Sequence, residues 1–122
     1  MVKSKKFILW FNEVNNKDVK FVGGKNASLG EMYQTLTRQG VSIPYGFAIT
    51  AYAYRHFIEK GGVKDEIKKI IKGLDTHSVR DLQKRGYKVR KTIYEAKMPK
   101  DLEEAIVDAY HKLSTISKER KP

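Results

Sequence analysis

The segment FVGGKNASLGEM, residues 21–32, places two glycines and a lysine at the start of an amphipathic helix. Glycine adopts positive φ and lets a ligand come close to the backbone, and the first N–H groups of a helix have no partner within it. The helix dipole adds partial positive charge at the same end. The segment therefore predicts an anion-binding turn that a phosphate group would fit.

The Gly23-Gly24-Lys25 run is not a P-loop, because that motif needs four residues between its glycines and a Ser or Thr after the lysine. On residue chemistry alone, two interpretations stay open. One is a phosphate-binding turn in which the Lys25 ammonium meets phosphate oxygens. The other is a tight turn that carries a solvated lysine.

Composition indicates one globular domain in residues 1–122, with 40% apolar and 32% charged residues. The formal charge of +11 attracts anions such as nucleotides, nucleic acids or acidic partners. Acidic residues are interspersed among the basic ones, which is typical of a lysine-rich solvated surface. Nucleic-acid binding is therefore disfavoured, since it rests on charge alone.

The chain contains no cysteine, which excludes disulfides, thiolate metal sites and a cysteine nucleophile and fits a cytoplasmic protein. The apolar run at residues 7–11 is too short for a signal peptide or a membrane span and is interpreted as a buried strand. The histidines His56, His77 and His111 lack the spacing of a zinc site or of a nucleophile and base, so neither catalytic nor metal-binding residues are predicted.

Hydrophobic spacing predicts a helix-rich α+β fold with two or three short strands and five helices. Extended segments are expected at residues 7–14, 19–22 and 47–49. Helices are expected at residues 26–39, after a Thr50 cap, around residues 67–74, from a Ser78 cap to about residue 96, and after Pro99. The predicted buried positions of the second and last helices include Tyr54 and Tyr110, and most of the other tyrosines are expected to pack in the core.

Three blocks resemble the amino-terminal part of the phosphoenolpyruvate synthase (pyruvate, water dikinase) family. They are VGGKNASLGEM at residues 22–32, GVSIPYGFAITA at residues 40–51 and AYRHFI at residues 53–58, with a weaker similarity over residues 74–113. Related segments open pyruvate phosphate dikinase and the dikinases that phosphorylate antibiotics and glucans. The NASLGEM sequence favours the synthase over these other dikinases.

The resemblance implies that residues 1–122 form the first lobe of an ATP-grasp nucleotide-binding domain. In that family the lysine of the Gly-Gly-Lys segment lies in the ATP site, and it corresponds to Lys25. Gly23 and Gly24 carry over as the turn that permits close approach, with the backbone of Asn26 and Ala27 as further expected donors. None of the histidines matches the family's phosphohistidine motif.

The chain ends at Lys121-Pro122, before the family's Arg-Ser-Ser strand, acidic magnesium ligands, phosphohistidine domain and pyruvate-binding barrel. We therefore expect a truncated, ATP-binding module that is inactive alone, with Mg²⁺ needed in the full enzyme but no ligand for it assignable here. Self-association, or association with the rest of the enzyme, is expected to cover exposed apolar surface. The alternatives are a regulatory or interaction module that keeps the fold, and the ATP-binding segment of a pyruvate phosphate dikinase-like enzyme.

Overall fold

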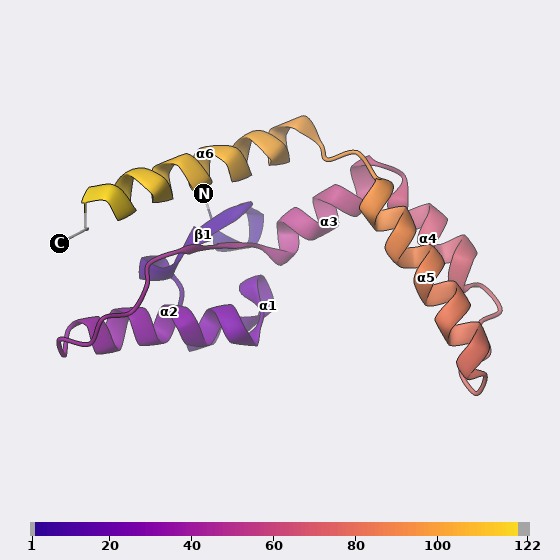
Figure 1. Cartoon of the computed structure of the whole chain (residues 1–122), viewed down its shortest axis with the longest axis horizontal. Helices are drawn as coiled ribbons and strands as arrows, with labels where there is room; N and C mark the ends of the chain where they lie inside the picture. Colours follow the sequence, from indigo (N-terminus) through magenta and orange to yellow (C-terminus); the bar gives the residue numbers. More distant parts are fainter. Residues whose placement is uncertain (1, 120–122) are drawn as a thin grey trace. The chain divides into compact units, whose positions relative to one another are not determined.

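The computed structural model describes residues 2–119 and contains two compact units (Figure 1). The first unit is formed by the described parts of residues 1–54 and 100–122, and the second by residues 55–99. Helix α3, Ala51–Lys60, contributes to both units. Each unit is considered below by itself.

The first unit contains a two-stranded antiparallel sheet and most of the irregular structure. Strand β1, Ile8–Trp10, pairs with β2, Phe47–Ile49, so that Leu9 lies opposite Ala48. Three short 3₁₀ segments lie near them: η1 (Lys3–Lys5), η2 (Phe11–Glu13) and η3 (Asn16–Asp18). The helices of this unit are α1 (Val19–Val22), α2 (Gly24–Thr37), the start of α3, and α6 (Lys100–Glu119).

The core of the first unit is formed by small and branched side chains from the sheet and from the segment that leads into α2. Its buried members are Leu9, Val14, Val22, Ala27 and Ala48, with Phe21 packed against them. Two of these, Val22 and Ala27, flank the Gly23-Gly24-Lys25 turn on either side. The core therefore holds both ends of the predicted anion-binding segment in place.

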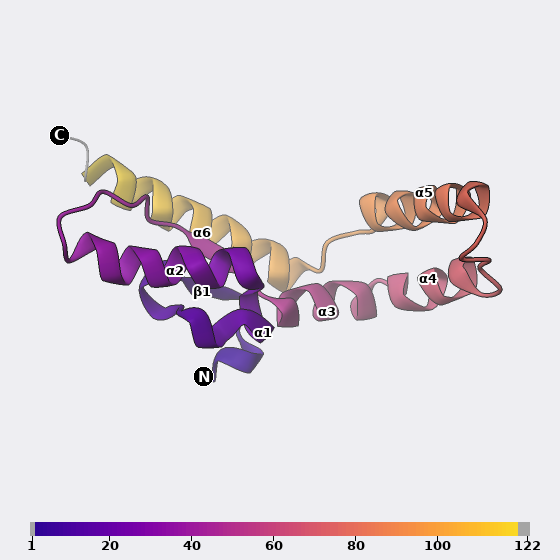
Figure 2. The same cartoon turned by 90° about the horizontal axis from the view of Figure 1, so that it is seen from below.

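The second unit contains two helices that lie side by side, α4 (Val63–Ile71) and α5 (Val79–Glu95) (Figure 2). Gly62 precedes α4 with φ +71°, a left-handed conformation that glycine adopts without strain. Ser78 caps α5, since its side-chain oxygen accepts a hydrogen bond from the Asp81 N–H at 3.1 Å. Residues 72–78 connect the two helices.

Several sequence predictions are confirmed. The fold is helix-rich and contains a small sheet, β2 spans residues 47–49, and α5 ends at Glu95. Thr50 caps α3, because its hydroxyl oxygen accepts the Ala53 N–H at 3.1 Å.

Other predictions are wrong. Residues 19–22 form the short helix α1 instead of an extended segment, so the described residues contain six α-helices where five were expected. The first strand covers only residues 8–10, because the chain turns into η2 directly after Trp10. Tyr54 and Tyr110 are exposed although burial was predicted, and so are Tyr87 and Tyr94. Helical spacing identified their helices correctly but did not show which face another element would cover.

Candidate functional site

Gly23 forms the junction between α1 and α2 and determines its geometry. Its φ of 84° and ψ of 164° lie in a region that is essentially restricted to glycine. Its N–H donates to the Val19 carbonyl at 2.7 Å, which closes the single turn of α1. The chain then enters α2 directly at Gly24, and no side chain caps the new helix.

The start of α2 leaves three backbone donors without an acceptor among residues 2–119. They are the N–H groups of Gly24, Lys25 and Asn26, since the first intrahelical bond of α2 joins the Ala27 N–H to the Gly23 carbonyl at 3.0 Å. Three converging N–H groups at a helix start, together with the helix dipole, favour a negatively charged ligand. This is the arrangement that the sequence predicted for a phosphate site.

The Lys25 side chain is exposed and enters no hydrogen bond or ion pair within the described part of the chain. Its ammonium is therefore available to a ligand. Four hollows on the surface of the described residues are lined by other side chains.

The five predicted contact residues, 23–27, lie together but have different roles in the structure. Asn26 donates from its side-chain amide to the Val22 carbonyl at 3.1 Å, so the side chain secures the end of α1 while the Asn26 N–H remains unpaired. Ala27 is buried, and its N–H is already engaged by Gly23. Contact between a ligand and Ala27 stays a prediction.

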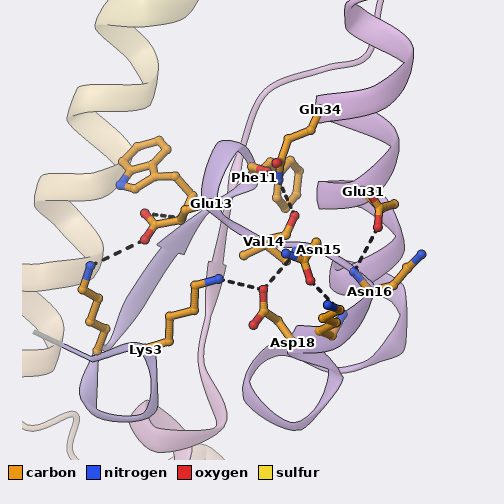
Figure 3. Close-up of polar contacts among 12 residues, drawn as sticks. Lys3, Phe11, Glu13, Val14, Asn15, Asn16, Asp18, Glu31 and Gln34 are labelled. Atoms are coloured by element: carbon orange, nitrogen blue, oxygen red, sulfur yellow. Dashed lines mark hydrogen bonds and ion pairs between the residues drawn. The ribbon is translucent and has the colours of Figure 1, made fainter.

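Helix α2 is anchored by residues that sequence reasoning did not single out (Figure 3). The side-chain amide of Gln34 donates to the carbonyls of Phe11 at 3.0 Å and Val14 at 2.6 Å. Gly30 lies so close to the same segment that a Cβ added to it would stand 2.4 Å from the Val14 carbonyl oxygen. A glycine inside a helical pattern is the one sequence signal that indicates such an approach.

A buried carboxylate, Asp18, organises the segment before α1 (Figure 3). One of its oxygens, Oδ2, accepts from the Asn15 N–H at 3.0 Å and from the Lys3 ammonium at 2.9 Å. Burial raises the pKa of Asp18, but these two hydrogen bonds and the positive charges of Lys3 and Lys20 outweigh it and hold the pKa below its usual value. The carboxylate is therefore charged at neutral pH and fixes the entry to α1.

Aromatic rings cluster on the first unit around Tyr45, which stands between Pro44 and Gly46 in the sequence. The Tyr45 ring stacks on Trp10 with centroids 5.4 Å apart and tilts against Tyr33 at 4.9 Å. The Phe47 ring is tilted against the Trp10 ring, with the ring centroids 5.2 Å apart. Tyr45 thus has a packing role.

Within residues 2–119, no three or more His, Asp or Glu side chains lie close enough together to hold a metal ion. None of the helices in this part of the chain has the length and apolar character needed to cross a membrane.

The fold and the turn together define a helix-rich α+β module that presents unpaired amides and a lysine at a helix start. Comparison with known families agrees with this class. The family model described as "Pyruvate phosphate dikinase, AMP/ATP-binding domain" matches residues 19–122. The chain therefore belongs to the pyruvate phosphate dikinase AMP/ATP-binding domain family.

Proteins with similar sequences include several phosphoenolpyruvate synthases. That of Aquifex aeolicus is 51% identical over 112 residues, which cover 92% of this chain and 13% of the relative. That of Synechocystis is 47% identical, covering 88% of this chain and 13% of the relative, and that of Escherichia coli is 42% identical, covering 91% and 14%. The aligned region is thus a small part of each relative, and the resemblance to phosphoenolpyruvate synthases is confirmed.

Proposed function

We propose that this chain supplies part of the ATP site of a phosphoenolpyruvate synthase-like dikinase, within an ATP-grasp domain. The observation that carries the proposal is the set of three unpaired amides beside an exposed, unpartnered Lys25. Membership of an AMP/ATP-binding family and similarity to phosphoenolpyruvate synthases support the choice of ligand and of enzyme.

The geometry suits the triphosphate more than the rest of the nucleotide. The N–H groups of Gly24, Lys25 and Asn26 would donate to phosphate oxygens, and the Lys25 ammonium would neutralise part of their charge. Gly23 and Gly24 carry no side chain that would block the approach, and a Cβ added to either would meet nothing within 4 Å. Magnesium accompanies ATP in such enzymes, where it would bind phosphate oxygens and acidic residues outside the set described here.

In the whole enzyme, we place this site in the reaction that converts ATP, pyruvate and water into phosphoenolpyruvate, AMP and phosphate. Phosphoryl transfer depends on lysine, arginine and metal charges acting together to position and neutralise the phosphates. Of these, we assign only Lys25 in this chain. We therefore propose that the chain alone does not turn over, and that it works in the cytoplasm with the remainder of a larger enzyme.

The binding proposal is tested by NMR titration of the isotope-labelled chain with ATP and Mg²⁺. We expect the amide resonances of Gly24, Lys25 and Asn26 to shift most, and Lys25→Ala to weaken binding about tenfold, as for the loss of one charge-assisted hydrogen bond. Lys17→Ala is the matched control, because Lys17 is also exposed and carries the same charge. Absence of shifts at these amides in the unmodified chain would refute the proposal.

A regulatory or interaction module that keeps the fold is the second candidate, and the same titration separates it. Such a module would keep its fold and show no response to ATP. A coupled assay for phosphoenolpyruvate tests the catalytic part separately, since product formed by the chain alone would contradict its proposed inactivity. Dependence of the complete enzyme on inorganic phosphate, with pyrophosphate as a product, would instead indicate the pyruvate phosphate dikinase reaction.

A further inference from the structure

The positive charge of the protein is concentrated in its second unit. Residues 55–99 contain 13 Lys and Arg against six Asp and Glu, and thus carry +7 of the formal charge of +11. None of the five residues of the proposed ATP turn belongs to this unit. The excess charge of the α4–α5 pair is therefore unexplained by that site.

A hollow of about 470 Å³ lies along α4 and α5. Its lining comes from both helices and from the residue that follows α4, and it consists of Glu66, Lys69, Ile70, Lys72, Asp81, Lys84, Arg85 and Lys88. Five of these eight side chains are basic and two are acidic. Ile70 is the single apolar member.

Arg85 and Asp81 neutralise each other and fix one wall of this hollow. The Arg85 guanidinium donates to Asp81 at 2.9 Å and to the Ile70 carbonyl at 2.9 Å, and also to the Lys72 carbonyl. Asp81 in turn accepts from the Asp75 N–H at 3.0 Å. Arg85 thereby binds the carbonyls at the end of α4 and ties this end to α5.

The remaining basic charges are only partly compensated, since Lys84 interacts electrostatically with Asp81 and Glu66 adds one negative charge to the lining. The ammonium groups of Lys69, Lys72, Lys84 and Lys88 form no ion pair or hydrogen bond within residues 2–119, and Glu66 is the one further acidic residue in the lining. Four like charges around one hollow repel each other, and a bound anion would relieve that repulsion. The fixed Arg85–Asp81 pair keeps the two helices in position around it.

We propose that this hollow binds a small polyphosphate anion. Its lining has no aromatic ring on which a nucleobase could stack, and one apolar side chain is too little to hold an organic ligand. The exposed rings of Tyr87 and Tyr94 belong to a different strip of α5 and do not line it. Several point charges around a polar hollow suit an ion that consists of phosphate groups alone.

Calorimetric titration of the full chain with tripolyphosphate tests this proposal. The measurement is made in a Lys25→Ala background, which weakens binding at the α2 turn. The variants that are compared differ only in α4 and α5, so each proposal can fail separately. We expect one site, weakened about tenfold by the double variant Lys69→Gln with Lys88→Gln, since two exposed ion pairs are lost. The matched control is Lys68→Gln with Lys91→Gln, which removes the same charge from the same two helices outside the hollow.

Three results would overturn the proposal. Equal weakening by both double variants, or no binding at all, would show that the charge is a diffuse solvated surface. Tighter binding of a single-stranded oligonucleotide of equal charge, lost in Tyr94→Ala, would show that the unit is a nucleic-acid surface instead. Retained affinity in the control variant, together with a loss in the Lys69/Lys88 variant, supports the polyphosphate site.

Discussion

Replacement of Gly30 by alanine tests whether the close approach of α2 to the Val14 segment determines how the candidate site is held. In the structure, a Cβ on Gly30 would stand 2.4 Å from the Val14 carbonyl oxygen and 2.8 Å from Val14 Cβ and Cγ1. Real Cβ atoms do not tolerate such distances, and the closest obstacle is backbone. Helix α2 or the Val14 segment must therefore move.

The magnitude follows from three terms. Overpacking a core contact costs about 1–3 kcal/mol. Displacing Val14 also weakens the bond from Gln34 to its carbonyl, which is worth about 1 kcal/mol. Alanine stabilises the helix by about 0.5–1 kcal/mol relative to glycine, because it is the better helix former. The net loss of folding free energy is about 2 kcal/mol, which corresponds to a fall in Tm of about 8 °C for a chain of this size.

Thermal and urea unfolding followed by circular dichroism measures this loss. Gly24→Ala is the matched control, because a Cβ there meets nothing within 4 Å and the residue lies at the start of the same helix. We expect the control to change stability by less than about 1 kcal/mol. Equal stability of the Gly30 and Gly24 variants would refute the packing argument.

Three further predictions concern two supports of the first unit and the exposed apolar side chains. The pKa of Asp18 is lowered in the folded state, so its contribution to folding stability is present above the unfolded pKa of about 3.9 and is lost as the pH falls through the folded pKa. In urea unfolding, the difference in stability between the unmodified chain and Asp18→Asn should therefore shrink between pH 7 and pH 3. A constant difference would contradict this. Thr50 is 2% exposed, and its hydroxyl group donates to the Lys6 carbonyl and accepts from the Ala53 N–H. In the same assay, Thr50→Val should therefore destabilise the fold by about 1–2 kcal/mol. An unchanged unfolding midpoint would argue against the cap. Large apolar side chains such as Tyr94, 91% exposed, lead us to expect self-association in sedimentation velocity, and a monomer at every concentration would count against it.

Local sequence signals predicted the parts of this protein that depend on neighbouring residues. Apolar spacing located five helices, and the caps at Thr50 and Ser78 and the strand at 47–49 needed only a few residues of context. The Gly23-Gly24-Lys25 run predicted a turn with unpaired amides, because glycine pairs before a helical pattern permit this backbone almost regardless of their surroundings. Similarity of three sequence blocks led to the correct family.

Tertiary contacts decided the rest. The close approach at Gly30 and the bonds of Gln34 join residues about 16 to 23 positions apart, and Thr50 reaches Lys6 across 44 positions, so no local pattern contains them. The exposure of Tyr54 and Tyr110 was missed for the same reason, since spacing shows that a helix has an apolar face but not whether anything covers it. Sequence alone therefore determined five of the six α-helices among residues 2–119 and the glycine turn before α2. Only the packed structure determined how that turn is supported and where the basic hollow forms, because both depend on contacts between segments that are distant in the chain.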